Sequence, residues 1–159
     1  MDILLVAYKD MILSITQGYW EGRVSISKPI YMLAILDAIE RNVLISNKIE
    51  LNDVYIRNKF GEFYKQYNGN EKGYLAAFFI RPYYHLNTAP FYHLVWKEEN
   101  RPPIKGHTPS ARYFQEHLLY AKLDDELWEL LQNAEYREFI RKSIITRFLY
   151  KKLLLSAKS

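Results

Sequence analysis

The sequence predicts a helix-rich α+β domain in which a winged-helix-like helical core carries a small antiparallel β ribbon. The helices are predicted by apolar residues that recur every three or four positions, most clearly after Ser27-Lys28-Pro29, because proline suits a first helical turn. The ribbon is predicted by the unit Pro-aromatic-Tyr-His-Leu, which occurs at Pro82–Leu86 and again at Pro90–Leu94. Helix, strand, helix and then ribbon is the order of a winged helix-turn-helix. With 159 residues, we expect 1–159 to form a single domain.

The first half of the chain is predicted to contain three helices and one strand. Apolar spacing predicts a helix over Asp2–Gln17, so that residues 1–24 form an N-terminal helix and a connector. The second helix runs from Ser27 to about Asn42, and apolar residues cover most of its circumference, which places it centrally in the core. A strand at Ser46–Leu51 and a helix at Val54–Tyr67 follow.

The middle of the chain is predicted to be β structure. A strand at Tyr74–Ile80 leads into the two Pro-aromatic-Tyr-His-Leu copies. Because each proline removes a backbone donor, neither copy is expected to be an uninterrupted helix. We therefore expect two short strands that pair with each other, joined by a turn at Asn87–Ala89.

The last third is predicted to be a loop followed by helices. Lys97–Pro109 holds charged residues, prolines and a glycine, and its length as a loop indicates either function or disorder. Helices are expected after Ser110, after Asp124-Asp125 and over Tyr136–Leu155. The last of these is basic, and we interpret its charges as a solvated face.

Composition excludes several classes of chemistry. The chain has no cysteine, so it offers neither disulfides nor thiolate chemistry. No phosphate-binding glycine loop, nucleophile elbow or HNH-type metal cluster occurs, and the one conceivable metal pair is His85 with His93 facing each other across the ribbon. We expect no catalytic residues, no metal and no cofactor, and hence a protein that is not an enzyme.

Net charge and aromatic content are compatible with a nucleic-acid partner but do not require one. The formal net charge is +4 and aromatic residues make up 16% of the chain, which suits either contact with a polyanion or a tyrosine-rich core. Neither a signal peptide nor an apolar run of membrane-spanning length is present, so we expect a cytoplasmic protein with no membrane partner.

Two positions are candidates for ligand binding on physical grounds. Lys28 lies at the start of a helix, beside free amide groups and the positive end of the helix dipole, where a bound anion would suit it. A solvated lysine before a helix is the alternative. Arg81, Pro82 and His85 either rim a surface cavity or belong to an aromatic core whose histidines are satisfied by hydrogen bonds.

Several motifs recur in an order that matches a known family. They are Ser27-Lys28-Pro29 before a leucine-rich helix, Arg81-Pro82-Tyr83-Tyr84-His85-Leu86 followed by Pro90-Phe91-Tyr92-His93-Leu94, Thr108-Pro109-Ser110, and the stretch from Ala121 to Leu131. Over residues 25–150 the chain resembles the sulfur-binding domain found N-terminal to the HNH nuclease of modification-dependent (type IV) restriction endonucleases. That family binds DNA in which an R-configured sulfur replaces a non-bridging phosphate oxygen. The sulfur occupies a shallow apolar cavity on the proline-aromatic motif.

The resemblance implies a set of DNA-binding residues. Pro82 would form the cavity floor with Arg81 and His85 at its edges, and a downstream cation would come from the loop or the helix after it. The implied DNA-binding residues are Ser27, Lys28, Arg81, Pro82, Tyr83, His85, Lys105, His107 and Arg112. This chain departs from the family in having Arg81 where an aromatic residue precedes the proline, and His85 where a small residue is usual. The larger imidazole would narrow the cavity.

The resemblance predicts a non-catalytic module that recognises backbone-modified, phosphorothioated duplex DNA in restriction or defence. No nuclease motif occurs in these 159 residues, so cleavage would come from a separate nuclease subunit. One alternative is a general winged-helix regulator that uses Val54–Tyr67 as its recognition helix, with Arg57 and Lys59 on the DNA. Another is an interaction subunit that holds a nuclease through the tyrosine-rich ribbon.

Overall fold

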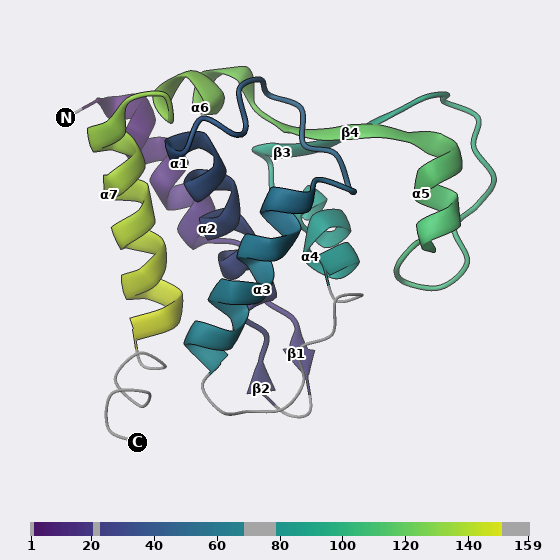
Figure 1. The fold of residues 1–159 in the computed structure, drawn as a ribbon, viewed down its shortest axis with the longest axis horizontal. Helices are drawn as coiled ribbons and strands as arrows, with labels where there is room; N and C mark the ends of the chain where they lie inside the picture. The colour runs from purple at the N-terminus through teal and green to yellow at the C-terminus, as the bar shows by residue number, and fades with distance from the viewer. Residues whose placement is uncertain (1, 21–22, 69–78, 151–159) are drawn as a thin grey trace.

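The fold is built around helix α2 (Ser27–Glu40), ten of whose fourteen residues are buried. The computed structural model describes residues 2–20, 23–68 and 79–150. In it α2 packs against α3 (Val54–Asn68), α4 (Ile80–His85) and α7 (Ala134–Ile144), as Figure 1 shows. Apolar residues on several faces of α2 are therefore buried against other helices. The predicted central place of this helix is confirmed.

Both ends of α2 follow from its sequence. At the start, Pro29 occupies the first turn, where its missing amide hydrogen is not needed. At the end, Asn42 adopts a left-handed backbone conformation with φ 57°. The amide of Val43 then donates to the carbonyl of Ala38 at 2.9 Å, and the amide of Asn42 donates to Ile39 at 3.1 Å. This pattern closes the last turn and ends the helix near the predicted residue.

The N-terminal segment forms a helix and a small hairpin. Helix α1 (Ile3–Leu13) is capped by Asp2, whose carboxylate accepts from the amide of Leu4 at 2.8 Å. It ends four residues before the predicted end and packs against α7. The connector then forms two short antiparallel strands, β1 (Tyr19–Trp20) and β2 (Arg23–Val24).

The strand predicted at Ser46–Leu51 is wrong except for one residue. Ile49 forms an isolated bridge with Ala121, with N–O distances of 2.7 and 2.8 Å. The Asn47 side chain is the physical reason, because its amide bonds both the carbonyl and the amide of Leu123, at 2.7 and 2.9 Å. A side chain thus takes the place of the backbone that a longer ladder would need. The helix predicted next is confirmed as α3, capped by Asp53.

The first Pro-aromatic-Tyr-His-Leu copy is helical, which corrects the prediction that it forms a strand. Pro82 is the third residue of α4, in the first turn, where helix amides have no carbonyl partner within the helix. The chain continues as a 3₁₀ turn, η2 (Leu86–Thr88), over the residues predicted as a turn. The strand predicted at Tyr74–Ile80 lies mostly outside the described residues, and Ile80 begins α4.

The second copy does enter a β ribbon, but with a partner far along the chain. Strand β3 (Tyr92–Trp96) pairs antiparallel with β4 (Leu118–Leu123), in a register that sets Leu94 opposite Ala121. The predicted pairing of the two copies with each other is therefore wrong. Strand β4 was not predicted, and it follows directly on α5 (Ala111–His117). The helix-rich α+β class is confirmed, and the winged-helix arrangement stays a prediction.

Helix α6 (Asp125–Leu130) follows its predicted acidic start, whereas α7 begins two residues before the predicted Tyr136. Helix α6 has acidic residues in its first turn, and α7 begins where Asn133 accepts from the amides of Glu135 and Tyr136. Helix α7 passes into a π-helical turn, η3 (Ile145–Leu149), and the rest of the predicted helix lies beyond the described residues. Within the described ranges, no helix is long and apolar enough to cross a membrane.

Buried tyrosines form the centre of the core. The hydroxyls of Tyr31 and Tyr92 are 2.9 Å apart, and Tyr92 also donates to the carbonyl of Tyr83 at 2.5 Å. Tyr83 donates in turn to the carbonyl of Ile49 at 2.6 Å. Burial raises the pKa of Tyr31 and Tyr92, which keeps these hydroxyls protonated at neutral pH. This network fixes α4 against α2 and β3.

Candidate functional site: the Pro82 cavity

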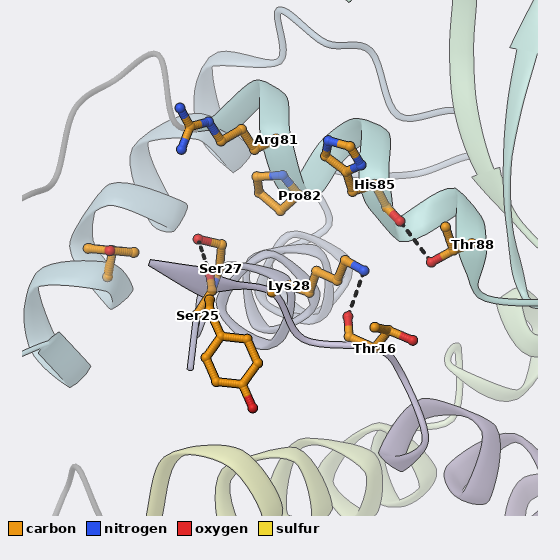
Figure 2. Close-up of a pocket in the computed structure, with 11 residues that line it drawn as sticks. Thr16, Ser25, Ser27, Lys28, Arg81, Pro82, His85 and Thr88 are labelled. Carbon is orange, nitrogen blue, oxygen red and sulfur yellow. Dashed lines mark hydrogen bonds between the residues drawn. The ribbon is translucent and has the colours of Figure 1, made fainter. Parts of the chain in front are cut away.

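A surface cavity of about 440 Å³ opens where the start of α2 meets α4, and we call it the Pro82 cavity. It brings together five of the predicted DNA-binding residues, Ser27, Lys28, Arg81, Pro82 and His85. Figure 2 shows Pro82 between Arg81 and His85, facing the beginning of α2. Two motifs that are distant in sequence thus form one site.

The helical conformation of α4 explains this grouping. Residues three and four apart share one face of a helix, so Arg81 and Pro82 lie on the same face as His85. The strand predicted here would have put Arg81 and Pro82 on opposite faces. Tyr83 points the other way, is fully buried and donates to Ile49. The prediction that Tyr83 contacts DNA is therefore corrected, because its ring belongs to the core.

The start of α2 supplies a desolvated cation. The Nζ of Lys28 donates to the carbonyl of Thr16 at 2.7 Å, and burial lowers the pKa of this lysine. Beside it, the hydroxyl of Ser25 donates to that of Ser27 at 3.1 Å. A positive charge at the positive end of a helix dipole is unfavourable without an anion nearby. The geometry therefore favours occupation of this end of the cavity by an anion.

His85 is half-buried and forms part of the cavity wall. Its Nε2 is hydrogen-bonded to the hydroxyl of Thr108 at 2.8 Å, which ties α4 to the loop after β3. Burial lowers the pKa of His85, and the positive charges of Lys28, His107 and Arg81 lower it further. The cavity keeps its volume of about 440 Å³ with the imidazole in place, so this departure from the family pattern leaves the cavity open.

The comparison with solved structures bears on the fold. The chain is similar to a structure described as the sulfur-binding domain of ScoMcrA complexed with phosphorothioated DNA, with a TM-score of 0.67 and 13% sequence identity. The similarity covers 92% of this chain and 98% of that one. The chain therefore shares the fold of that structure. At the level of sequence, no protein-family model matches the chain and no curated protein matches it.

The three downstream cations lie at different distances from the Pro82 cavity. Lys105, His107 and Arg112 are exposed and are not among the residues that line the cavity. His107 nevertheless lies near enough to His85 to lower its pKa, whereas Arg112 forms an ion pair with Glu116 at 2.8 Å. The structure therefore connects only His107 of these three with the Pro82 cavity.

The fold also brings to the cavity residues that the sequence analysis did not single out. Polar walls come from the connector and from the end of η2, and two aromatic rings come from β1 and α3. These residues are Thr16, Tyr19, Ser25, Tyr64 and Thr88. For part of this set the sequence offered one signal, the hydroxyl of Ser25 two residues before Ser27.

The histidines do not pair across a ribbon. His93 bonds the carboxylate of Asp124 at 2.5 Å, while His85 bonds Thr108. Within residues 2–20, 23–68 and 79–150, no three His, Asp or Glu side chains gather into a group that could hold a metal ion. The Pro82 cavity presents the ring of Pro82 beside the cations Lys28 and Arg81.

Proposed function

We propose that this chain is a non-catalytic module that binds duplex DNA carrying a backbone phosphorothioate, in a restriction or defence system where a partner nuclease carries out any cleavage. The observation that carries the proposal is the Pro82 cavity, which combines an apolar floor with Lys28 and Arg81 in a chain that has the sulfur-binding fold. The family motifs occupy the matching positions in the sequence.

The residue types suit the two parts of a phosphorothioate. Sulfur is larger, softer and a poorer hydrogen-bond acceptor than oxygen, so the buried ring of Pro82 can contact it without leaving a donor unsatisfied. The charge of the phosphate requires cations, and Lys28 and Arg81 lie on the cavity wall. Such cations supply most of the affinity for DNA and its dependence on salt.

The alternative that α3 acts as a recognition helix receives less support. The guanidinium of Arg57 lies over the ring of Phe79, 5.1 Å from its centroid, and Lys59 pairs with Glu62 at 2.9 Å. Both cations therefore have partners within the chain, and DNA would have to displace them. Lys28 is also bonded within the chain, to the carbonyl of Thr16, but Lys28 and Arg81 line one concave site together, where a single anion could contact both.

The test is competition between two duplexes that differ only in one R-phosphorothioate, at about physiological salt because non-specific binding is strongly salt-dependent. We expect a preference of about tenfold or more for the modified duplex, roughly 1.4 kcal/mol. Pro82→Ala should abolish the preference, because it removes the ring that contacts sulfur while leaving a good helix former. Lys28→Ala should weaken the binding of both duplexes to the same extent.

The second copy of the motif provides the matched control. Pro90 is exposed and does not line the Pro82 cavity, so Pro90→Ala should keep the full preference. Equal binding of the two duplexes by the unaltered chain would overturn sulfur recognition and leave general DNA binding. Absence of binding to either duplex, even at low salt, would favour the interaction subunit.

A further inference from the structure

His85 occupies an unusual electrostatic position. Three elements contribute basic groups near it: Lys28 from α2, His107 from the loop after β3, and Arg81 from its own helix. The hydroxyl of Thr108 bonds its ring, and the Tyr84 ring packs edge-on against it. No aspartate or glutamate is among the described residues that line the cavity. A proton on His85 therefore has several repulsive neighbours in the empty cavity.

A bound phosphate group would reverse this balance. An opposite charge within about 4–6 Å favours the charged form of a titratable group and shifts its pKa by about 1–3 units. A phosphodiester or phosphorothioate in the cavity would bring one negative charge to the wall that His85 forms. The same group would also neutralise part of the repulsion from Lys28 and Arg81.

The contact with Thr108 permits both protonation states. A hydroxyl both donates and accepts, so Thr108 can donate to a neutral Nε2 or accept from a protonated one. The change of state therefore does not break the hydrogen bond that ties α4 to the loop. In the protonated ring both nitrogens are donors, so Nδ1 can donate to a phosphate oxygen while Nε2 donates to Thr108.

We propose that His85 takes up a proton when a phosphate-type group enters the Pro82 cavity, so that DNA binding by this chain tightens as the pH falls through the neutral range. The inference rests on the proposed function and adds a regulatory property to the same site. It concerns a residue at which this chain departs from the family pattern, where a small side chain could not titrate.

The sign and the size follow from linkage. A group that gains proton affinity on binding makes the complex more stable at lower pH, by at most about tenfold in affinity per pH unit for one proton. The ordinary pKa of histidine, about 6.5, places the effect between about pH 6 and pH 8. Because the pKa of His85 is lowered, this side chain carries a proton less often in the free chain than an ordinary histidine does at the same pH.

The experiment measures binding of the phosphorothioate duplex by fluorescence anisotropy across this pH range, with the full chain and three variants. We expect the affinity of the unaltered chain to rise by about tenfold on going from about pH 8 to about pH 6. The affinity of His85→Gln should change by less than about twofold over the same range, because glutamine can still bond Thr108 but takes up no proton. His107→Gln should retain the pH dependence, because His107 does not line the cavity.

His93→Gln is the matched control, because His93 holds the same place in the second copy and bonds Asp124 away from the cavity. Its affinity for the duplex should depend on pH as that of the unaltered chain does. Calorimetry in buffers of different ionisation enthalpy gives a readout that needs no variant: at neutral pH the unaltered chain should take up protons on binding, and His85→Gln should take up fewer.

The outcomes separate the two proposals. Sulfur-selective binding that is independent of pH, or an unchanged pH dependence in His85→Gln, would overturn the role of His85 and leave the proposed function standing. Absence of duplex binding at every pH would overturn both.

Discussion

The two copies of the Pro-aromatic-Tyr-His-Leu unit have nearly the same sequence and different structures. Pro82–Leu86 forms most of α4 and the start of η2, whereas in Pro90–Leu94 the last three residues enter β3. The proline and histidine of the first copy line a cavity. In the second copy the proline is exposed and the histidine bonds the carboxylate of Asp124.

The difference shows that the packing partner decides what this sequence becomes. The second copy lies beside β4, whose backbone supplies hydrogen bonds for a strand. The first copy packs against α2 and has its proline in a first turn, where a helix needs no donor. Strand propensity reflects such surroundings more than the residues themselves. A cavity arises in the copy that is helical because a helix groups side chains three and four apart.

The largest difference between the two copies, in unfolding free energy lost on substitution, is expected at the final leucine of each. Leu86 is fully buried and Leu94 is only half-buried. Leu86→Ala should therefore lower the free energy of unfolding by about 2–5 kcal/mol, because it removes apolar contacts and leaves a void. Leu94→Ala should cost about 1 kcal/mol, since water already reaches part of the side chain. Urea denaturation followed by circular dichroism measures both.

Equal losses at the two leucines would contradict the contrast. They would mean that the second copy is packed as deeply as the first, and that β3 does not have one face toward solvent. A change in the denaturant slope, as distinct from the midpoint, would indicate an altered unfolded state, so the slope must be compared between variants.

The sequence predicted those helices that have both an apolar repeat and an end signal. Helix α2 has Pro29 at its start and Asn42 at its end, so its place could be derived. The prediction failed where a partner distant in sequence determines the local structure. Nothing local to Leu118–Leu123 indicates that its partner is β3, and nothing local to Asn47 indicates that its side chain bonds Leu123.

The candidate site was predicted through its motifs rather than through its geometry. Charge at a helix start identified Lys28, and the proline-aromatic motif identified Pro82 and His85. Tyr83 was assigned to DNA because it lies in the same motif, yet helical phase turns its ring into the core. Tyr64 was missed because its contribution depends on how α3 packs, which no residue pattern records.

A contrast of intermediate size is expected at the third residue of each copy. Tyr92 is fully buried, and its hydroxyl both meets that of Tyr31 and donates to Tyr83. Tyr92→Phe should cost about 1–3 kcal/mol of unfolding free energy, because it leaves buried polar groups without a partner. Tyr84 holds the same place in the first copy but is only half-buried, so Tyr84→Phe should stay within about 0.5 kcal/mol. A loss in Tyr84→Phe as large as that in Tyr92→Phe would mean that the network does not distinguish the copies.

The smallest contrast concerns the two histidines and the dependence of stability on pH. Burial, and then Lys28, His107 and Arg81, lower the pKa of His85 in the folded chain, while the unfolded chain has the ordinary value of about 6.5. Below that value the unfolded state binds more protons at this site, so the stability contributed by His85 is complete above about pH 6.5 and is lost as the pH falls below it.

His85→Gln should therefore lose less unfolding free energy than the unaltered chain on going from about pH 7.5 to about pH 5. The difference should be a fraction of a kcal/mol, because solvent screens a half-buried ring. Urea midpoints at several pH values measure it, and His93→Gln, which leaves His85 unchanged, should keep the pH dependence that His85 contributes. Parallel stability curves for the unaltered chain and His85→Gln would show that His85 binds protons equally well in both states. The empty cavity would then not repel a proton, and a phosphate would have no repulsion there to relieve.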